Sequence, residues 1–384
     1  MARDTADYEG SEEIAIANGK EALSKAPWLF NRNVGGSGFF VSLKKNNLVH
    51  PNHFAVHGVD GVGTKLFLAP WSGNYVLQMI DGIRMDANDF ATIIHAYPDT
   101  VNLYFAMQTE VEEQHMGQIM EGVRRGLEGI RIPSSPFDVN IGKLETASLD
   151  EMISLGVKNK GFDVGVVMTG YIEKDRLPNL DPKPGHVIVG VSSTGLHSNS
   201  FTGARHAILT PEVEYREEWK SQYTGRWGLD DKPECLEGQT VLEALQTPTA
   251  LYLAEAIEVG RLCGDPDVYG VNITGNGFAN FNRAGRDVSF EITDPFEPLP
   301  VHRFLAEESG WSPEVAYSKQ NMGTGFGYIF PSQEMASKSV DLINKRGENR
   351  AKIMGEVVSN KGELRTAIHK PYEGKPVTLT GYNN

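Results

Sequence analysis

Residues 58–65 read GVDGVGTK, a glycine-rich turn that follows a strand-like run, HFAVHGVD, at 53–60. The turn nearly matches the phosphate-binding P-loop, GxxxxGK followed by Ser or Thr. However, Thr64 precedes Lys65 instead of following it, and a carboxylate, Asp60, lies inside the loop. The lysine of a P-loop also opens a helix, whereas Pro70 interrupts the residues that follow here, LFLAPWSG. The sequence therefore disfavours a P-loop.

Asp60 is better explained as a metal ligand. A hard cation such as Mg²⁺ binds carboxylates and bridges to phosphate oxygens, so it converts the repulsion between Asp60 and a phosphate into attraction. Lys65 would then place a positive charge beside the same phosphates. The alternative is a turn that merely closes a strand, which a short motif by itself does not exclude.

Three carboxylates lie within residues 75–96, YVLQMIDGIRMDANDFATIIHA, whose apolar spacing predicts a helix that stops at Tyr97-Pro98. Asp86 and Asp89 are three residues apart, and Asp81 is eight residues before Asp89. We therefore expect all three near one face of the helix. Carboxylates crowded on one face repel one another unless a cation or solvent separates them. The alternative is a solvated helix face, which the apolar neighbours disfavour.

Two further glycine-rich stretches suit a nucleotide site. NVGGSGFFVSL at 33–43 is a flexible loop that runs into a strand-like segment, which suits a lid over a nucleotide. SSTGLHSNSF at 192–201 offers Ser198, Asn199 and backbone N–H groups to an anion at a helix start. Simple N-capping would account for only one of these residues. His197 is either a phosphate donor or a packed turn histidine.

The chain alternates strand-like and helix-like segments, which predicts an α/β or α+β class with two lobes. Strand-like runs lie at 53–60, 101–108 and 162–172, and helix-like runs at 75–96, 110–130, 202–209, 247–262 and 332–347. The stretch RLPNLDPKPGH at 176–186, rich in Pro and charge, is the expected boundary between domains 1–175 and 176–384. Residues 211–240 are polar and charged, and we expect them to be loosely ordered.

Composition narrows the class of function. The 384 residues carry a formal net charge of −14, with a sequence pI of about 5.2, which disfavours a nucleic-acid partner. No apolar stretch approaches the roughly 20 residues of a membrane span, and the acidic start MARDTADYEGSEE lacks the apolar region of a secretory signal. Only Cys235 and Cys263 are present. We therefore expect a cytoplasmic protein without a disulfide framework or a Cys-based metal site.

Taken in order, the motifs resemble those of the aminoimidazole ribonucleotide synthetase family, also called phosphoribosylformylglycinamidine cyclo-ligases. VGGSGFF is similar to the GGFGG loop of the family, and VDGVGTKLFLA to its TDGVGTK signature. The resemblance covers nearly the whole chain. Further matches follow in family order: EIAIANGKEAL, IDGIRMDANDF, FDVGVVMTGYIEK, SSTGLHSNSF, TPTALYL, ITGNGF, NMGTGFGYIFP and RGENRAKIMGEVV.

The resemblance implies an ATP-dependent closure of formylglycinamidine ribonucleotide to 5-aminoimidazole ribonucleotide, with Mg²⁺ at the triphosphate. It implies a two-domain aminoimidazole ribonucleotide synthetase-like fold, whose N-terminal domains pair in a homodimer and form a β-barrel. By this resemblance the catalytic residues are Asp60, Lys65 and Glu145, and the metal ligands are Asp60 and Asp89. The implied ATP-binding residues are Gly35, Gly36, Ser37, Gly38, Asp60, Gly61, Thr64, Lys65, Asn88 and Asp89. The implied substrate-phosphate residues are Ser193, Gly195, His197, Ser198 and Asn199.

The chain departs from the family pattern in three places and so resembles a divergent member. The family stretch GGETAEMPG is reduced to IGKLETASLDEM, which keeps Glu145 but loses the second glycine and the proline. Lys143 is one of the replaced positions in this stretch. Leu103 replaces a family aspartate. Asn272 replaces a histidine, and Asn276 replaces a glycine.

Two other functions remain open. One is a small-molecule kinase similar to thiamine monophosphate kinase, although SSTGLHSNSF fits the cyclo-ligases better. The other is a non-catalytic paralogue that binds nucleotide. The persistence of Asp60, Lys65 and Asp89 disfavours the paralogue, because a decayed site would lose its costly buried charges first.

Overall fold

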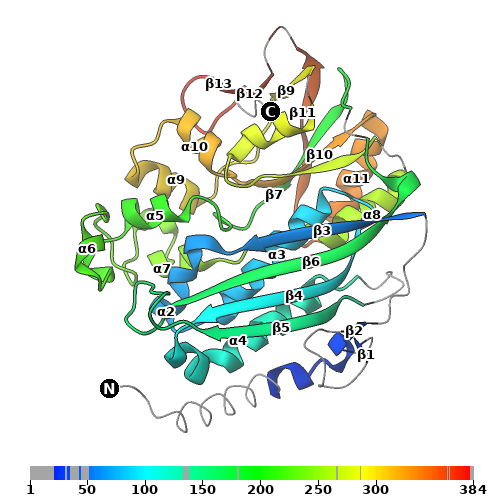
Figure 1. Cartoon of the computed structure of the whole chain (residues 1–384). Helices are drawn as coiled ribbons and strands as arrows, with labels where there is room; N and C mark the ends of the chain where they lie inside the picture. The colour runs from blue at the N-terminus through cyan, green and yellow to red at the C-terminus, as the bar shows by residue number, and fades with distance from the viewer. Residues whose placement is uncertain are drawn as a thin grey trace. The chain divides into compact units, whose positions relative to one another are not determined.

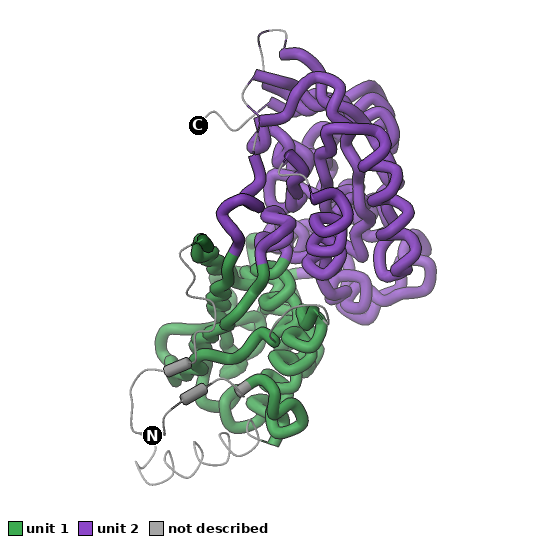
Figure 2. The backbone as a smooth tube through the Cα atoms, turned by 90° about the vertical axis from the view of Figure 1, so that its right-hand side faces the viewer, with its two compact units in different colours: residues 1–87, 97–171, 211–222 green, residues 88–96, 172–210, 223–384 purple. Residues whose placement is uncertain are grey.

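The chain folds into two compact units (Figure 2). Each unit is built around its own β-sheet. The first unit comprises residues 1–87, 97–171 and 211–222, and the second comprises 88–96, 172–210 and 223–384. This computed structural model describes residues 21–30, 33–34, 43–44, 52–132, 138–179, 181–264, 267–285, 287–360, 362 and 364–380. The two sheets confirm the predicted mixed α/β class.

The first unit contains a four-stranded sheet in the order β3-β6-β4-β5. Its strands are β3 (His53–Gly61), β4 (Tyr97–Met107), β5 (Asn140–Ser148) and β6 (Phe162–Glu173). Strand β4 runs antiparallel to β6 and parallel to β5, and Leu103 lies opposite Val166 and Leu144. A separate antiparallel pair is formed by β1 (Asn33–Val34) and β2 (Leu43–Lys44). The sheet confirms the strands predicted at 53–60, 101–108 and 162–172.

Two helices, α3 (Val76–Ala91) and α4 (Thr109–Gly129), cover one face of this sheet (Figure 1). They pack closely because α4 presents glycines to α3. A Cβ at Gly122 would lie 2.5 Å from the carbonyl oxygen of Val76, and one at Gly126 would lie 2.7 Å from the Ile83 side chain. A larger residue at either position would force the helices apart.

Helix α3 is shorter than the sequence predicted, since it ends at Ala91 and not near residue 96. Its last turn tightens into bonds between residues three apart: Thr92 N–H donates to the Asp89 carbonyl, and Ile93 N–H to the Phe90 carbonyl. The Thr92 hydroxyl also donates to the Asp89 carbonyl at 2.6 Å. Strand β4 then begins at Tyr97 and includes Pro98.

The first unit also contains short elements that connect the strands and helices. The turn η2 (Gly63–Phe67) and helix α2 (Leu68–Ser72) follow β3, and η1 (Pro27–Phe30) lies near the start of the described chain. Residues 211–222, which carry η4 (Pro211–Val213) and α6 (Glu217–Lys220), belong to this unit although their neighbours in sequence belong to the other.

The second unit contains a seven-stranded sheet in the order β13-β12-β9-β11-β7-β10-β8. Its strands are β7 (Val187–Ser192), β8 (Tyr269–Asn272), β9 (Val288–Ile292), β10 (Thr324–Phe330), β11 (Ala351–Ser359), β12 (Arg365–Ile368) and β13 (Val377–Thr380). Strand β10 is buried along its whole length between β7 and β8, with which it pairs antiparallel. Its mainly apolar sequence, TGFGYIF, suits a strand covered on both faces.

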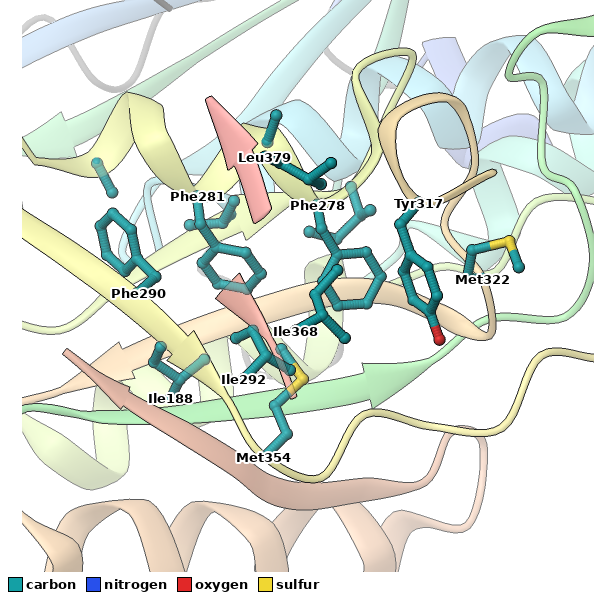
Figure 3. Packing of buried hydrophobic residues seen from close by; sticks show 14 of the residues in the cluster. Ile188, Phe278, Phe281, Phe290, Ile292, Tyr317, Met322, Met354, Ile368 and Leu379 are labelled. Atoms are coloured by element: carbon teal, nitrogen blue, oxygen red, sulfur yellow. The ribbon is translucent and has the colours of Figure 1, made fainter. Parts of the chain in front are cut away.

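The second unit also contains helical segments, some of which pack against its sheet. They are η3 (Lys174–Arg176), α5 (Phe201–Ile208), η5 (Glu234–Leu236), α7 (Val241–Gln246), α8 (Leu253–Cys263), η6 (Gly277–Ala284), α9 (Pro300–Glu308), α10 (Pro313–Lys319) and α11 (Gln333–Arg346). On one face an aromatic core forms, in which Phe278 contacts Tyr317 edge-on at 5.1 Å and Phe281 lies 5.9 Å from Phe290 (Figure 3). Burial of each such ring contributes on the order of 1.5–3 kcal/mol to folding.

Candidate functional site

The glycine-rich turn lies at the end of β3, in the first unit. Asp60 is half-buried in β3, and its Oδ1 accepts a hydrogen bond from the backbone N–H of Gly61 at 2.7 Å. Gly63 begins η2 with a φ of 63°, a left-handed conformation that favours glycine. Thr64 and Lys65 follow within η2. The turn is therefore a strand end followed by a 3₁₀ turn, without the long helix that follows a P-loop.

Lys65 points into the first unit, where it forms an ion pair that the sequence did not reveal. Its Nζ lies 2.8 Å from Oδ2 of Asp81, and neither side chain is exposed. Burial lowers the pKa of Lys65, while the charge of Asp81 and their hydrogen bond act in the opposite direction. This ion pair links η2 to helix α3. A contact between Lys65 and a phosphate would require the ammonium to leave Asp81.

The three acids of α3 have three different environments, although their spacing predicted a shared face. Asp81 pairs with Lys65, and Asp86 accepts a hydrogen bond at 2.9 Å from the backbone N–H of Met168 in β6. Asp89 belongs to the second unit and is exposed, where its Oδ1 accepts from Nδ2 of Asn272 at 2.8 Å. Asp81 and Asp86 thus fix α3 within the first unit, and Asp89 is the acid available to solvent.

Asn88 is buried within the second unit and organises the backbone before α8. Its Nδ2 donates to the carbonyl of Ala250 at 2.8 Å, and its Oδ1 accepts from the N–H of Tyr252 at 2.9 Å. Both ends of the amide are therefore engaged by backbone groups. The sequence predicted an ATP contact for Asn88; the structure assigns it these two bonds.

Glu145 lies on β5 and is about half exposed, with its Oε2 2.6 Å from Nζ of Lys143. Lys143, one of the departures from the family pattern, is thus the ion partner of the predicted catalytic carboxylate. Exposed pairs of this kind contribute at most about 1 kcal/mol, so Glu145 can exchange this partner for another at low cost.

The loop after β7 carries the predicted phosphate residues of the second unit. His197 is buried with a φ of 58°, and its Nε2 accepts from the N–H of Ala250 at 3.3 Å. Asn199 is buried and donates to the carbonyl of Ile273 at 3.3 Å. The hydroxyls of Ser193 and Ser198 are buried and make no hydrogen bond with other described residues. Such hydroxyls can donate to an anion that approaches the loop.

The second unit has a cavity of about 600 Å³ that begins where this loop ends. Ser200 and Gly203 of the first turn of α5 form one side, and Asn276 another. Trp311 and Lys319 complete its wall, with the Lys319 ammonium 5.0 Å from the centre of the Trp311 ring. Trp311 and Lys319 could not be predicted from the sequence, because they come from α10 and the residues before it and carry no motif.

Among the described residues, no group of three or more His, Cys, Asp or Glu side chains is arranged to hold a metal ion. Mg²⁺ commonly binds one or two carboxylates together with substrate phosphates. The half-buried carboxylate of Asp60 and the exposed one of Asp89 are hard oxygen ligands that fit this chemistry.

The lid predicted at Gly35, Gly36, Ser37 and Gly38 lies outside the described residues. In the part of the chain that the structure describes, no helix is both long and apolar enough to cross a membrane.

The fold defines a class of protein. Escherichia coli HypE, a hydrogenase maturation protein, superposes with a TM-score of 0.56 over 96% of this chain and 97% of HypE, at 15% identity. Thiamine-monophosphate kinase from Stenotrophomonas maltophilia also gives a TM-score of 0.56, over 94% of this chain and 97% of the kinase, at 11% identity. A HypE structure in complex with ATP gives a TM-score of 0.52 over 95% of each chain, at 14% identity. The chain therefore has the aminoimidazole ribonucleotide synthetase-like fold that these proteins share.

Curated relatives narrow the class to one family. The phosphoribosylformylglycinamidine cyclo-ligase of Methanococcus maripaludis is 30% identical over 87% of this chain and 84% of its own length. That of Methanosarcina barkeri is 32% identical over 78% of this chain and 79% of its own length. That of Methanopyrus kandleri is 35% identical over 67% of this chain, which spans 66% of the relative. No family model matches the sequence. The chain belongs to the phosphoribosylformylglycinamidine cyclo-ligase family.

Proposed function

We propose that this protein is a cytoplasmic, ATP-dependent and ADP-forming cyclo-ligase of purine biosynthesis. Its substrate would be formylglycinamidine ribonucleotide, and its product 5-aminoimidazole ribonucleotide. The observation that carries the proposal is the similarity to cyclo-ligases over most of both chains, at 30% identity across 336 residues for Methanococcus maripaludis. The presence of Asp60, Lys65 and Asp89 at the motif positions supports it.

The reaction would proceed in two steps. The γ-phosphoryl group of ATP passes to the amide oxygen of the substrate, and ADP leaves. The amidine nitrogen then attacks the activated carbon, inorganic phosphate leaves with the former amide oxygen, and loss of a proton completes the imidazole ring. Such chemistry depends on positioning the two reactants and on stabilising the charge of the transferred phosphoryl group.

Asp60 and Asp89 are the proposed ligands of Mg²⁺, and the structure describes each within its own unit. Mg²⁺ would supply positive charge to the triphosphate. Gly61 holds one oxygen of Asp60 through its backbone N–H at 2.7 Å, which limits the orientations of the carboxylate. Thr64, Lys65 and Asn88 are proposed to serve the nucleotide. Lys65 would do so either after leaving Asp81 or by holding the turn in place.

The substrate phosphate is proposed to bind at the loop after β7. The buried hydroxyls of Ser193 and Ser198 support this assignment, since each makes no hydrogen bond with other described residues. The adjoining cavity of about 600 Å³ is large enough for a ribonucleotide, and it places Lys319 and Ser200 beside the loop. Glu145 is proposed as a further catalytic carboxylate.

A homodimer is proposed, in which the four-stranded sheets of two chains pair to form a β-barrel. On the sheet face opposite α3 and α4, Tyr104 of β4 is 47% exposed and Val167 of β6 is 37% exposed. The two side chains share a face because Val167 lies opposite Asn102, two residues before Tyr104. Exposed apolar residues grouped on one face suit a partner surface.

An assay with purified protein separates the candidate functions. ADP release that requires formylglycinamidine ribonucleotide, with formation of the aminoimidazole product, supports the cyclo-ligase. ADP release with thiamine monophosphate alone would instead favour a kinase. Tight ATP binding without turnover of either substrate would favour a non-catalytic paralogue.

A further inference from the structure

Residues 211–222, PEVEYREEWKSQ, form an arm that packs within the first unit. Six of its twelve residues are charged, so its sequence is that of a surface loop. Two of these charges are nevertheless withdrawn from solvent. The side chain of Glu214 is fully buried, and that of Arg216 is 13% exposed. Burial of two opposite charges is favourable only where geometry and hydrogen bonds are good.

The guanidinium of Arg216 is fixed from two sides. Its Nε and Nη2 donate to the two oxygens of Glu214 at 2.8 and 2.7 Å, a bidentate fork. Its Nη1 donates to the carbonyl and the hydroxyl of Ser154 at 3.2 and 3.1 Å. A planar group held by four bonds has one orientation, which a lysine ammonium would not reproduce.

This fixed guanidinium lies beside η2, the turn that contains Thr64 and Lys65. It lies 5.6 Å from the ring centre of Phe67, the last residue of η2, and Lys65 is two residues earlier in the same turn. The ring of Trp71 in α2 is 5.5 Å from that of Phe67, and its Nε1 donates to the carbonyl of Val213 in the arm at 3.1 Å. The arm therefore contacts the turn η2 at Phe67, and helix α2, which follows the turn, at Trp71.

The turn depends on such contacts because its own structure is weak. Its residues form a single 3₁₀ turn, and helix α2 has only five residues. Segments of this length are marginal in isolation and take their geometry from packing. A displacement of about 1 Å can cost a catalytic site as much as 100-fold in rate.

We propose that the arm positions the turn for nucleotide binding, with Arg216 as its main positioning residue. This inference rests on the proposed function of the turn as part of the ATP site. The arm itself contacts no reacting atom in this scheme. It sets the position of Thr64 and Lys65 through Phe67 and Trp71.

The test compares variants of the full-length protein. Arg216→Ala removes the fork and the ring contact, and Arg216→Lys keeps the charge without the fork. Trp71→Phe keeps an aromatic ring, but it removes the bond to Val213 and the part of the indole that packs beside Gly156. The matched control is Lys220→Ala, which removes an exposed ion pair with Glu217 from the same arm. For each variant, calorimetry gives the Kd of a non-hydrolysable ATP analogue with Mg²⁺, kinetics give KM for each substrate, and thermal unfolding gives Tm.

We expect the Kd of the analogue and the KM for ATP to rise about tenfold in Arg216→Ala and Arg216→Lys, as a small displacement of the turn predicts. The KM for the ribonucleotide should change less than twofold, and Lys220→Ala should match the wild type. Wild-type affinity for the analogue in Arg216→Ala, even with a lower Tm, would overturn the inference. If Arg216→Ala does not fold, the Trp71→Phe variant tests the inference instead. We expect its Kd for the analogue to rise about threefold. An unchanged Kd would overturn the inference. Failure of the wild type to bind the analogue would overturn the proposed function as well.

Discussion

The ammonium of Lys65 lies 2.8 Å from a carboxylate oxygen of Asp81, and both side chains are fully buried. Each charge would be costly to bury alone, so the two residues depend on each other. The pair joins the glycine-rich turn to helix α3. The proposed nucleotide role of Lys65 must accommodate this contact.

Removal of one member should therefore be more damaging than removal of both. Asp81→Asn or Lys65→Met should lower the free energy of unfolding by about 3–5 kcal/mol, because the remaining buried charge loses its ion-pair partner at 2.8 Å. Lys65→Met combined with Asp81→Leu should recover most of this loss. Urea unfolding measures the values, and Lys143→Met, which breaks the exposed pair with Glu145, should cost at most about 1 kcal/mol. A loss below 1 kcal/mol in the single variants would show that the pair is not buried as described.

The same double variant tests the proposed contact between Lys65 and the phosphates. If Lys65 contacts the phosphates, the folded double variant loses nucleotide affinity, and this is the result we expect. Calorimetric titration with the ATP analogue measures it. Unchanged affinity would mean that Lys65 does not contact the phosphates.

Asp60 is predicted to be required for Mg²⁺-dependent turnover and dispensable for folding. Asp60→Asn keeps the shape of the side chain and an acceptor for Gly61 N–H, but it removes the charge that a hard cation needs. We expect kcat to fall by about 100-fold or more, with Tm nearly unchanged. The matched control is Asp163→Asn, since Asp163 likewise accepts from the next backbone N–H, at 2.8 Å, on β6 of the same sheet. Full activity of Asp60→Asn would refute its role as a ligand.

The strongly periodic elements could be predicted from the sequence. Helix α4 (Thr109–Gly129) lies within one residue of the predicted range 110–130, because its apolar residues recur at helical spacing over many turns. Helix α8 was predicted from residue 247 but begins at Leu253. The preceding residues are instead bound by Asn88, whose amide holds Ala250 and Tyr252. A hydrogen bond between segments more than 160 residues apart leaves no local signal.

The candidate site was harder to predict for the same reason. Spacing placed Asp81, Asp86 and Asp89 near one helix face, but it could not reveal that Lys65, Met168 and Asn272 each engage a different one of them. The polar composition of residues 211–240 predicted a loose segment. The structure instead anchors residues 211–222 through Glu214 and Arg216, because charged residues that pair with each other can be buried.

The exposed sheet face of the first unit should control assembly. Tyr104→Glu or Val167→Asp places a charge on the face that is proposed to pair with a second chain, and desolvation of that charge would weaken the dimer. Sedimentation should show a shift from dimer to monomer, whereas Met152→Asp, at a 78% exposed position outside this sheet, should leave assembly unchanged. A wild type that is monomeric, or variants that remain dimeric, would contradict the proposed barrel.

Stability should also depend on pH through Glu255. This carboxyl is buried in α8 and accepts one hydrogen bond from Nδ2 of Asn349 at 3.1 Å. Burial raises the pKa of Glu255 to about 8, although Asn349 and Arg346 act in the opposite direction. Between its ordinary pKa of 4.5 and this value, the folded protein holds a proton that the unfolded chain releases. The contribution of Glu255 is therefore complete below pH 4.5 and is lost as the pH rises to 8, at up to about 1.4 kcal/mol per pH unit.

Glu255→Gln provides the test, because glutamine has the shape of the protonated acid and does not titrate. Urea unfolding of both proteins at pH 5.5, 6.5 and 7.5 gives their difference in free energy of unfolding, which should grow in favour of the variant as the pH rises. We compare the two proteins because His302 also makes the free energy of unfolding depend on pH, in the direction opposite to Glu255. Burial lowers the pKa of His302 to about 4, so its contribution is lost as the pH falls from 6.5 towards 4. His302 is present in both proteins, and its effect cancels. A difference that stays constant across the three pH values would mean that Glu255 is ionised in the folded protein.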